Sequence, residues 1–161
     1  MVSLKYLLGF ATLASAARKL SIFRGTGQIR TLWNDGNHDD LGCLTDTGLW
    51  TSDETLCGVF EAARHNISPS KLTAFTLTSA AGPCQLHGAR FTCEPGNEAY
   101  EFGTWPWPNS VPGVECLRWG QYGLMASFGR NPPSPADPPQ EIHMVSSIEE
   151  GKYVWLAWAE L

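Results

Sequence analysis

Positive charge is scarce in this sequence of 161 residues. Eleven Lys and Arg stand against 16 Asp and Glu, which gives a formal net charge of −5 with His neutral. No segment gathers the basic residues into a stripe. Because an acidic balance repels phosphates, binding to nucleic acid or to anionic membranes is disfavoured. We therefore expect a carbohydrate or a protein surface as the partner, with no nucleic acid and no membrane.

Motifs for metal binding and hydrolysis are also lacking. C-x-x-C, H-x-x-x-H and Gly-x-Ser-x-Gly are absent, and the four histidines are scattered. A glycosidase would need two carboxylates about 5 to 9 Å apart in a cleft. The candidates are Asp39, Asp40, Glu94, Glu98 and Glu101. Since the sequence does not bring any two of them together, we expect no metal, no cofactor and no catalytic residue. A hydrolase with an unrecognised active site is the alternative.

Long apolar runs are scarce, and the clearest one comes at the start. Residues 6–14 are apolar, Lys5 precedes them, and Ser15, Ala16 and Ala17 follow. This layout is typical of a secretory signal peptide, and the run is about half of the roughly 20 residues that a membrane span needs. We expect residues 1–17 to be a signal peptide and residues 18–161 to form a single domain that is secreted into the extracellular space.

Cysteines are present, and export favours disulfides among them. Cys84 and Cys93 bracket a plausible turn at residues 87–88 and fit a stapled hairpin, while Cys43 and Cys57 fit a second local pair. Each bridge would add about 2 to 3 kcal/mol, although spacing alone leaves the connectivity open. Cys116 is left over as a buried thiol, as a partner in a different pairing, or as a link between chains. The chain is expected to be a monomer unless Cys116 joins two copies.

Short runs rich in β-branched, aromatic and leucine residues dominate the chain, and turn formers separate nearly all of them. The runs cover residues 28–33, 42–45, 48–51, 56–63, 72–79, 89–93, 116–119, 123–128, 141–147 and 153–160. The last run alternates with period two and carries aromatic residues on both faces, which is typical of a central strand. The pattern predicts an all-β fold, an antiparallel β-sandwich or barrel of about eight to ten strands.

Three segments do not follow this pattern. Residues 53–64, with Ser52 as a cap, offer a competing helix, and the glycine at position 58 argues against it. Residues 103–113 contain three prolines, which remove hydrogen-bond donors, so we expect a loop there. Residues 131–139 are expected to form an extended, polyproline-like connection on the surface or across a barrel end.

Trp105 and Trp107 stand between prolines in the expected loop and are the candidate ligand contacts. A stiff loop could present both indoles for stacking on a sugar ring or for anchoring a partner. In the alternative interpretation, both indoles fold back and plug the end of the sandwich. Asn66, in the triplet Asn-Ile-Ser, is a candidate glycosylation site, although Pro69 lowers the expected occupancy.

The sequence also resembles a known module. Gly-Cys-Leu at 42–44, Gly-Leu-Trp at 48–50, Cys-Gly-Val-Phe at 57–60, Ser-Ala-Ala-Gly-Pro-Cys at 79–84 and Phe-Thr-Cys at 91–93 resemble the C-terminal accessory module of fungal ribonucleases of the T2 family. The likeness covers roughly residues 25–161. It implies a secreted β-domain with two disulfides and no established chemistry.

Ribonuclease T2 chemistry itself is not expected. The family's catalysis uses two histidines for general acid–base work, in a His-Gly-Leu-Trp-Pro segment and a His-Glu-x-x-x-His-Gly segment. Neither is present, and Thr47 stands where the first catalytic histidine would be. We therefore expect a non-catalytic domain with a binding or interaction role, with carbohydrate as the candidate ligand. The alternative is a small secreted fungal effector that binds a host protein.

Overall fold

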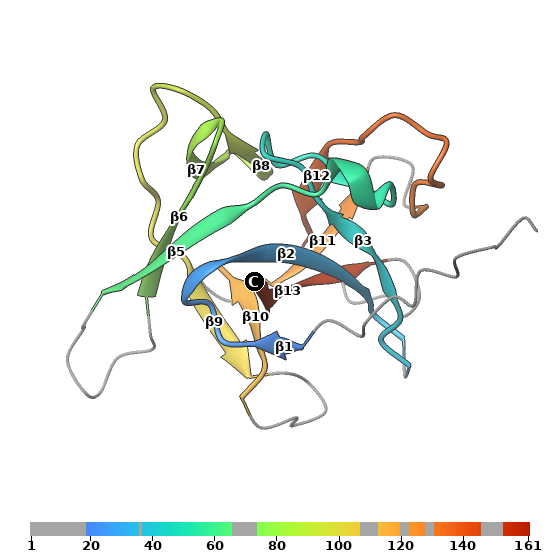
Figure 1. Cartoon of the computed structure of the whole chain (residues 1–161), viewed down its shortest axis with the longest axis horizontal. Helices are drawn as coiled ribbons and strands as arrows, with labels where there is room; N and C mark the ends of the chain where they lie inside the picture. Colours follow the sequence, from blue (N-terminus) through green and yellow to red (C-terminus); the bar gives the residue numbers. More distant parts are fainter. Residues whose placement is uncertain are drawn as a thin grey trace, which may run out of the picture.

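Antiparallel strands account for most of the structure in this computed structural model, which describes residues 19–35, 37–65, 74–106, 113–119, 123–127, 131–145 and 153–161 (Figure 1). The strands are β1 (Leu20–Ser21), β2 (Gly25–Trp33), β3 (Asp40–Leu44), β4 (Trp50–Thr51), β5 (Phe60–His65), β6 (Ala74–Ser79), β7 (Gly82–His87), β8 (Arg90–Cys93), β9 (Gly103–Pro106), β10 (Glu115–Arg118), β11 (Leu124–Ser127), β12 (Ile142–Met144) and β13 (Val154–Glu160). One 3-10 turn, η1 (Glu54–Leu56), lies between β4 and β5. The all-β prediction is confirmed.

The pairing of β2 with β13 closes the sheet. These strands run antiparallel in seven consecutive residue pairs, from Val154 opposite Trp33 to Glu160 opposite Gly27. From β2 the pairings continue through β5, β6, β7, β8, β12 and β11 and return to β13. The result is a closed circuit of eight strands, so the barrel is the form that the fold takes.

Two strand pairs branch from this circuit. The second edge of β2 is divided, because its residues 25–27 pair with β5 while Arg30 and Leu32 pair with β3. β3 in turn carries β4, and these two form the β3–β4 branch. The second edge of β13 is shared by β11, β10 and β1, and β10 carries β9 to form the β9–β10 branch. Figure 1 shows β2 curving across the molecule beside β13.

The period-two pattern of the last strand matches its burial. Val154, Leu156 and Trp158 belong to the main hydrophobic core. Ala157 and Trp155 pack on the opposite face, in a smaller cluster with Leu32, Leu20, Val114 and Cys116. Because β13 is paired along both edges and buried on both faces, it needs apolar residues at nearly every position. The prediction of a central strand is confirmed.

Two of the sequence-based predictions need correction. Residues 103–113 were predicted to be a loop throughout, but residues 103–106 form β9, with Pro106 opposite Glu115. β9 ends the strand order, where a proline costs no interior ladder bond. The strand predicted from residue 56 begins only at Phe60. η1 precedes it, and Asp53 rather than Ser52 caps this turn by accepting a hydrogen bond from the Thr55 amide.

The proline-rich connection packs against the β3–β4 branch. Pro133 is buried, and its carbonyl accepts a hydrogen bond of 2.8 Å from the Ser52 hydroxyl. The main chains of Gln140 and Trp50 exchange two hydrogen bonds, of 2.7 and 2.8 Å. The connection is therefore held to β4 at both ends, while most of the residues between them are exposed.

Both expected cysteine pairs are disulfides in the structure. Cys84 and Cys93 lie directly opposite each other on the β7–β8 hairpin. The two residues between these strands begin with Gly88, whose φ of 64° lies in the left-handed region that favours glycine. Cys43 and Cys57 join β3 to the residue that follows η1. The second bridge therefore fixes the 3-10 turn to the sheet.

The buried guanidinium of Arg30 also holds η1 to the sheet. Arg30 on β2 is 2% exposed, and its guanidinium donates hydrogen bonds to Asp40 at 2.9 Å and to Glu54 at 2.5 Å. Burial lowers the pKa of Arg30, but the hydrogen bonds and charges of Glu54 and Asp40 outweigh burial and raise it above its usual value. Its Nη1 also lies 3.3 Å from the Sγ of Cys57. Arg30 thus links β2, β3 and η1.

Removing either disulfide should lower the free energy of unfolding. Loop closure predicts a loss of about 3 kcal/mol for the 14-residue separation and about 2.5 kcal/mol for the 9-residue separation. We expect Cys43→Ala/Cys57→Ala and Cys84→Ala/Cys93→Ala to lose about these amounts in urea unfolding. A reductant should destabilise the native protein and leave a variant without all four residues unchanged. An unaltered urea midpoint for the reduced native protein would contradict the disulfide assignment.

Replacing Arg30 with methionine should destabilise the fold by about 2 kcal/mol, because two carboxylates lose their cation while the apolar stem is kept. The loss is smaller than for a fully buried pair, since the Asp40 and Glu54 side chains are 41% and 49% exposed. Chemical denaturation measures the effect. Arg24→Met, a matched change at an exposed arginine, should leave stability within about 0.5 kcal/mol. Equal losses of stability for the two substitutions would contradict this account of Arg30.

Candidate functional site

Trp105 lies on the outer face of the β9–β10 branch. It is opposite Cys116 on β10, and paired residues share a face of the sheet. The next pair along, Thr104 and Leu117, faces the other way, and Leu117 belongs to the main core. Trp105 is 37% exposed. It therefore does not plug the barrel, and a third of its surface is available to a ligand.

The guanidinium of Arg118 lies over the Trp105 ring, 4.7 Å from its centroid. This is the geometry of a cation–π contact. The described residues offer Arg118 no carboxylate within ion-pair distance. Arg118 covers one face of the indole and holds the ring in place. The exposed surface of Trp105 is the remainder of the ring.

A second exposed tryptophan, Trp119, was not predicted as a site residue. It is 38% exposed, and its indole donates a hydrogen bond to the Tyr100 hydroxyl. Tyr100 packs in turn on Phe102 in the core, with the ring centroids 5.3 Å apart. Because neighbouring residues of an extended chain point to opposite faces, Trp119 and Arg118 diverge. Trp119 and Trp105 therefore lie on opposite faces of the β9–β10 branch.

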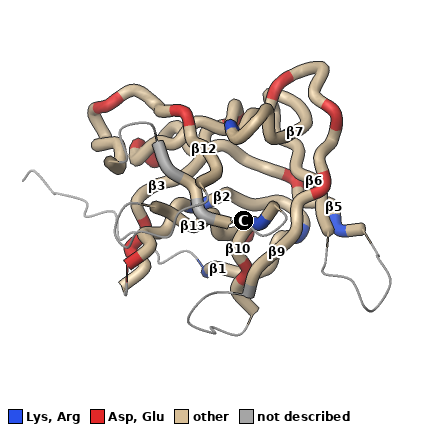
Figure 2. Tube along the Cα trace, turned by 180° about the vertical axis from the view of Figure 1, so that it is seen from behind, with Lys and Arg blue, Asp and Glu red and all other residues tan. Residues whose placement is uncertain are grey.

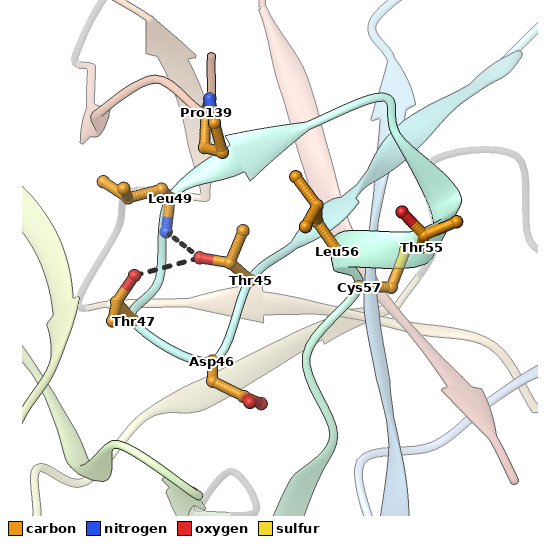
Figure 3. A pocket seen from close by; sticks show the side chains of 8 residues that line it. All are labelled: Thr45, Asp46, Thr47, Leu49, Thr55, Leu56, Cys57 and Pro139. Atoms are coloured by element: carbon orange, nitrogen blue, oxygen red, sulfur yellow. Dashed lines mark hydrogen bonds between the residues drawn. The ribbon is translucent and has the colours of Figure 1, made fainter. Parts of the chain in front are cut away.

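A hollow of about 370 Å³ opens between the β3–β4 branch and η1 (Figure 3). Its wall combines threonine and aliphatic side chains, while the Asp46 carboxylate points away from them (Figure 3). The lining residues are Thr45, Asp46, Thr47, Leu49, Thr55, Leu56, Cys57 and Pro139. The hollow is not visible in the sequence, because it is assembled from the β3–β4 loop, η1 and the proline-rich connection.

Hydrogen bonds fix the loop that forms one wall of this hollow. The amide of Thr45 donates to the Leu49 carbonyl at 2.8 Å, and the Leu49 amide donates to the Thr45 hydroxyl at 3.1 Å. The Cys93 amide donates to the Thr47 carbonyl at 3.1 Å, which ties the loop to β8. On the other side, Gly58 packs so closely against the backbone of residues 45 and 46 that a side chain would clash. The wall is therefore preorganised.

Arg90, Glu141 and His143 form a polar cluster where β8 meets β12. The Arg90 guanidinium donates to Glu141 at 2.7 Å, and Nε2 of His143 lies 3.4 Å from the second oxygen of the same carboxylate. The hydrogen bond from Arg90 holds the pKa of Glu141 below its usual value. A general acid near neutral pH needs a raised carboxyl pKa. Glu141 is therefore suited to an ion pair rather than to proton donation.

The pKa values of two other carboxyl groups are also lowered. Hydrogen bonds from Thr55 lower the pKa of Asp53, and the hydrogen bond from the Ser134 amide lowers that of Asp137. Of the carboxylates considered for glycoside hydrolysis, Asp40 is bound to Arg30. Within the described ranges, no group of three or more His, Cys, Asp or Glu side chains could hold a metal ion.

The remaining predicted positions fall into two groups. Cys116 is a free thiol with no exposed surface, and burial, followed by the charge of Glu115, raises its pKa well above the usual value. This matches the buried-thiol alternative. Trp107 and Asn66 lie outside the described residues. The described part of the chain also contains no helix with the length and hydropathy of a membrane span.

Comparison with known families gives a match. The family model of the RNase T2-like C-terminal domain matches residues 21–106. This is just over half of the chain, from β1 to β9, and it includes both disulfides. The match ends well before residue 161, to which the resemblance had been expected to extend. Comparison with curated proteins and with solved structures gave no match. With more than half of its length matched, the chain belongs to the RNase T2-like C-terminal domain family.

Proposed function

We propose that this domain is a non-catalytic binding module that recognises carbohydrate, with Trp105 as the main contact. The observation that carries the proposal is the 37% exposed indole on the outer face of β9. An indole offers a broad apolar surface on which the C–H face of a sugar ring stacks. Trp107, two residues further along the chain, is proposed as the second contact.

The surroundings of Trp105 favour such a role. β9 is paired with β10 over four residues, and Arg118 packs against the ring. A side chain that is already ordered loses little entropy when a ligand binds. The guanidinium also places hydrogen-bond donors beside the indole, where the hydroxyl groups of a stacked sugar would lie. The pair therefore supplies both an apolar surface and polar contacts.

We further propose that the domain acts outside the cell. Two disulfides in a domain of this size are typical of an oxidising compartment. Glycosylation of Asn66 belongs to the same proposal.

Binding to insoluble chitin, glucan and cellulose tests the carbohydrate role. At least one polymer should retain the purified protein, and Trp105→Ala should weaken that retention about tenfold, as expected for the loss of a stacking contact of about 1.5 kcal/mol. Trp105→Phe, which keeps an aromatic ring, should recover part of it. The measurement is a depletion isotherm with increasing polymer.

Trp119→Ala is the matched control, because Trp119 is equally exposed but points away from Arg118. It should leave retention unchanged. If none of the three polymers retains the native protein, the carbohydrate proposal is wrong. Equal losses for the Trp105 and Trp119 variants would show that Trp105 has no special role.

A further inference from the structure

Arg118 has no counter-ion in the part of the chain that the structure describes. Its guanidinium contacts the Trp105 ring, and its Nε is buried without a hydrogen-bond partner among the described residues. In contrast, Arg30, Arg64 and Arg90 each bind a carboxylate. A guanidinium carries five N–H donors, and its strongest partners are anions with two oxygen atoms. Arg118 is therefore a binding group for an anion, placed directly beside an exposed indole.

Two glycines leave the space that Arg118 and Trp105 occupy on the outer face of the β9–β10 branch. Gly103 is the residue opposite Arg118, and a Cβ at position 103 would lie 3.3 Å from Nε of Arg118. A Cβ at Gly123 would lie 3.0 Å from Cδ1 of Trp105 and 2.9 Å from the Trp155 ring. Arg118 thus crosses the bare position of Gly103 to reach the indole, and Gly123 lets the indole pack at its Cδ1 edge. The pair is therefore arranged before a ligand arrives, which lowers the entropy cost of binding.

The local charge beside Trp105 is positive. β9 holds no charged residue, and the carboxylate of β10, Glu115, is on the opposite face from Arg118 and binds Arg64. In Figure 2, several acidic positions lie on the loops at the top of the view, whereas most of the blue positions lie near β1, β5 and the C-terminus. The whole chain carries a net charge of −5, but charges more than about 8 Å away are largely screened at physiological salt. The branch therefore favours an anionic group although the chain is acidic.

We propose that this pair binds an acidic sugar, whose ring stacks on Trp105 and whose carboxylate binds Arg118. The inference rests on the proposed carbohydrate role and names the class of sugar for the same site. The apolar indole surface suits the C–H groups of a sugar ring. The planar guanidinium suits the two oxygens of a carboxylate. A uronic acid unit carries both groups, and the two side chains that would receive them are in contact with each other.

Neutral sugars and acidic peptides each satisfy only half of this arrangement. A sugar that stacks on Trp105 also removes water from part of the adjoining guanidinium, and this loss must be compensated. A hydroxyl group compensates it less well than a carboxylate, because hydrogen bonds between two ionised groups are the stronger ones. An acidic side chain of a peptide would reach Arg118 but offers no ring of C–H groups to the indole. The two side chains together therefore select a sugar that carries a carboxylate.

Retention on a polymer and on its oxidised form tests this inference. Chitin, glucan or cellulose with the primary hydroxyls of its surface oxidised carries uronic acid units, keeps its linkages and stays insoluble. Whichever polymer retains the full chain should bind it about three- to fivefold more tightly in the oxidised form, as expected for a partly exposed ion pair. Depletion isotherms in about 0.15 M salt measure the ratio of the two affinities. In about 1 M salt, where screening is nearly complete beyond about 3 Å, the ratio should fall toward one.

Three substitutions assign the preference to Arg118. Arg118→Gln removes the charge and should bring the ratio of the two affinities to about one. The ratio is the readout because this variant also loses the contact that orders Trp105, which weakens binding to both forms. Arg118→Lys keeps the charge without the planar fork and should keep part of the preference. Arg90→Gln is the matched control, because Arg90 is also partly exposed but is already bound to Glu141. It should leave the ratio unchanged.

Several results would overturn the acidic-sugar assignment. These are equal affinity of the native protein for both forms of the polymer, or a preference that Arg118→Gln retains. Soluble polyacrylate, which has carboxylates but no sugar rings, should not release the protein from the oxidised polymer. Release as complete as that by soluble polyglucuronate would show a general attraction to polyanions. Retention on the neutral polymer that depends on Trp105, with no gain on oxidation, would leave the proposed function intact and defeat only this inference. Retention on no polymer in either form would defeat the proposed function itself.

Discussion

The seven-residue pairing between β2 and β13 is the interaction on which the rest of the structure depends. It joins strands near the two ends of the chain, and it turns an open series of hairpins into a closed circuit. Without β13, the sheet would end at β11 and β2 would expose an unpaired edge, which invites association with other chains. The core depends on the same pairing, because Leu156 and Trp158 fill the interior from β13. A contact between such distant segments carries a loop-closure cost, which the seven residue pairs and the core contacts of β13 must offset.

Trp105 and the hollow beside η1 both lie on the branches rather than on the closed circuit. Trp105 belongs to the β9–β10 branch, and the hollow is built from the loop of the β3–β4 branch together with η1. A rigid scaffold with exposed additions is a common arrangement for binding, because loops and edges can vary without disturbing the core. In this protein the two branches are also anchored to the rest of the fold. Arg30 and the Cys43–Cys57 disulfide fix η1, and Arg118 fixes the indole of Trp105.

Much of this fold could be predicted from the sequence, and particular residues explain what could not. The alternation of β13 and the local cysteine pairs depend on near neighbours in the chain, so they are visible in the sequence. β9 was missed because Pro106 argues against a central strand, and the sequence does not reveal that β9 is an edge. The role of Arg30 depends on Asp40 and Glu54, which only the folded chain brings together. The hollow was invisible for the same reason, since Pro139 meets Leu49 across 90 residues of sequence.

The family match adds a further point, because it covers β1 to β9 and stops before β13. The strand that closes the barrel thus lies outside the segment by which the family is identified. Amide hydrogen exchange measures most directly whether that closure exists in solution. The amides of residues 28–32 and 155–159 that bond between the two strands should be among the slowest to exchange, near the limit set by global unfolding. Exchange of these amides as fast as that of the exposed residues 94 and 96 would contradict a barrel closed by β2 and β13.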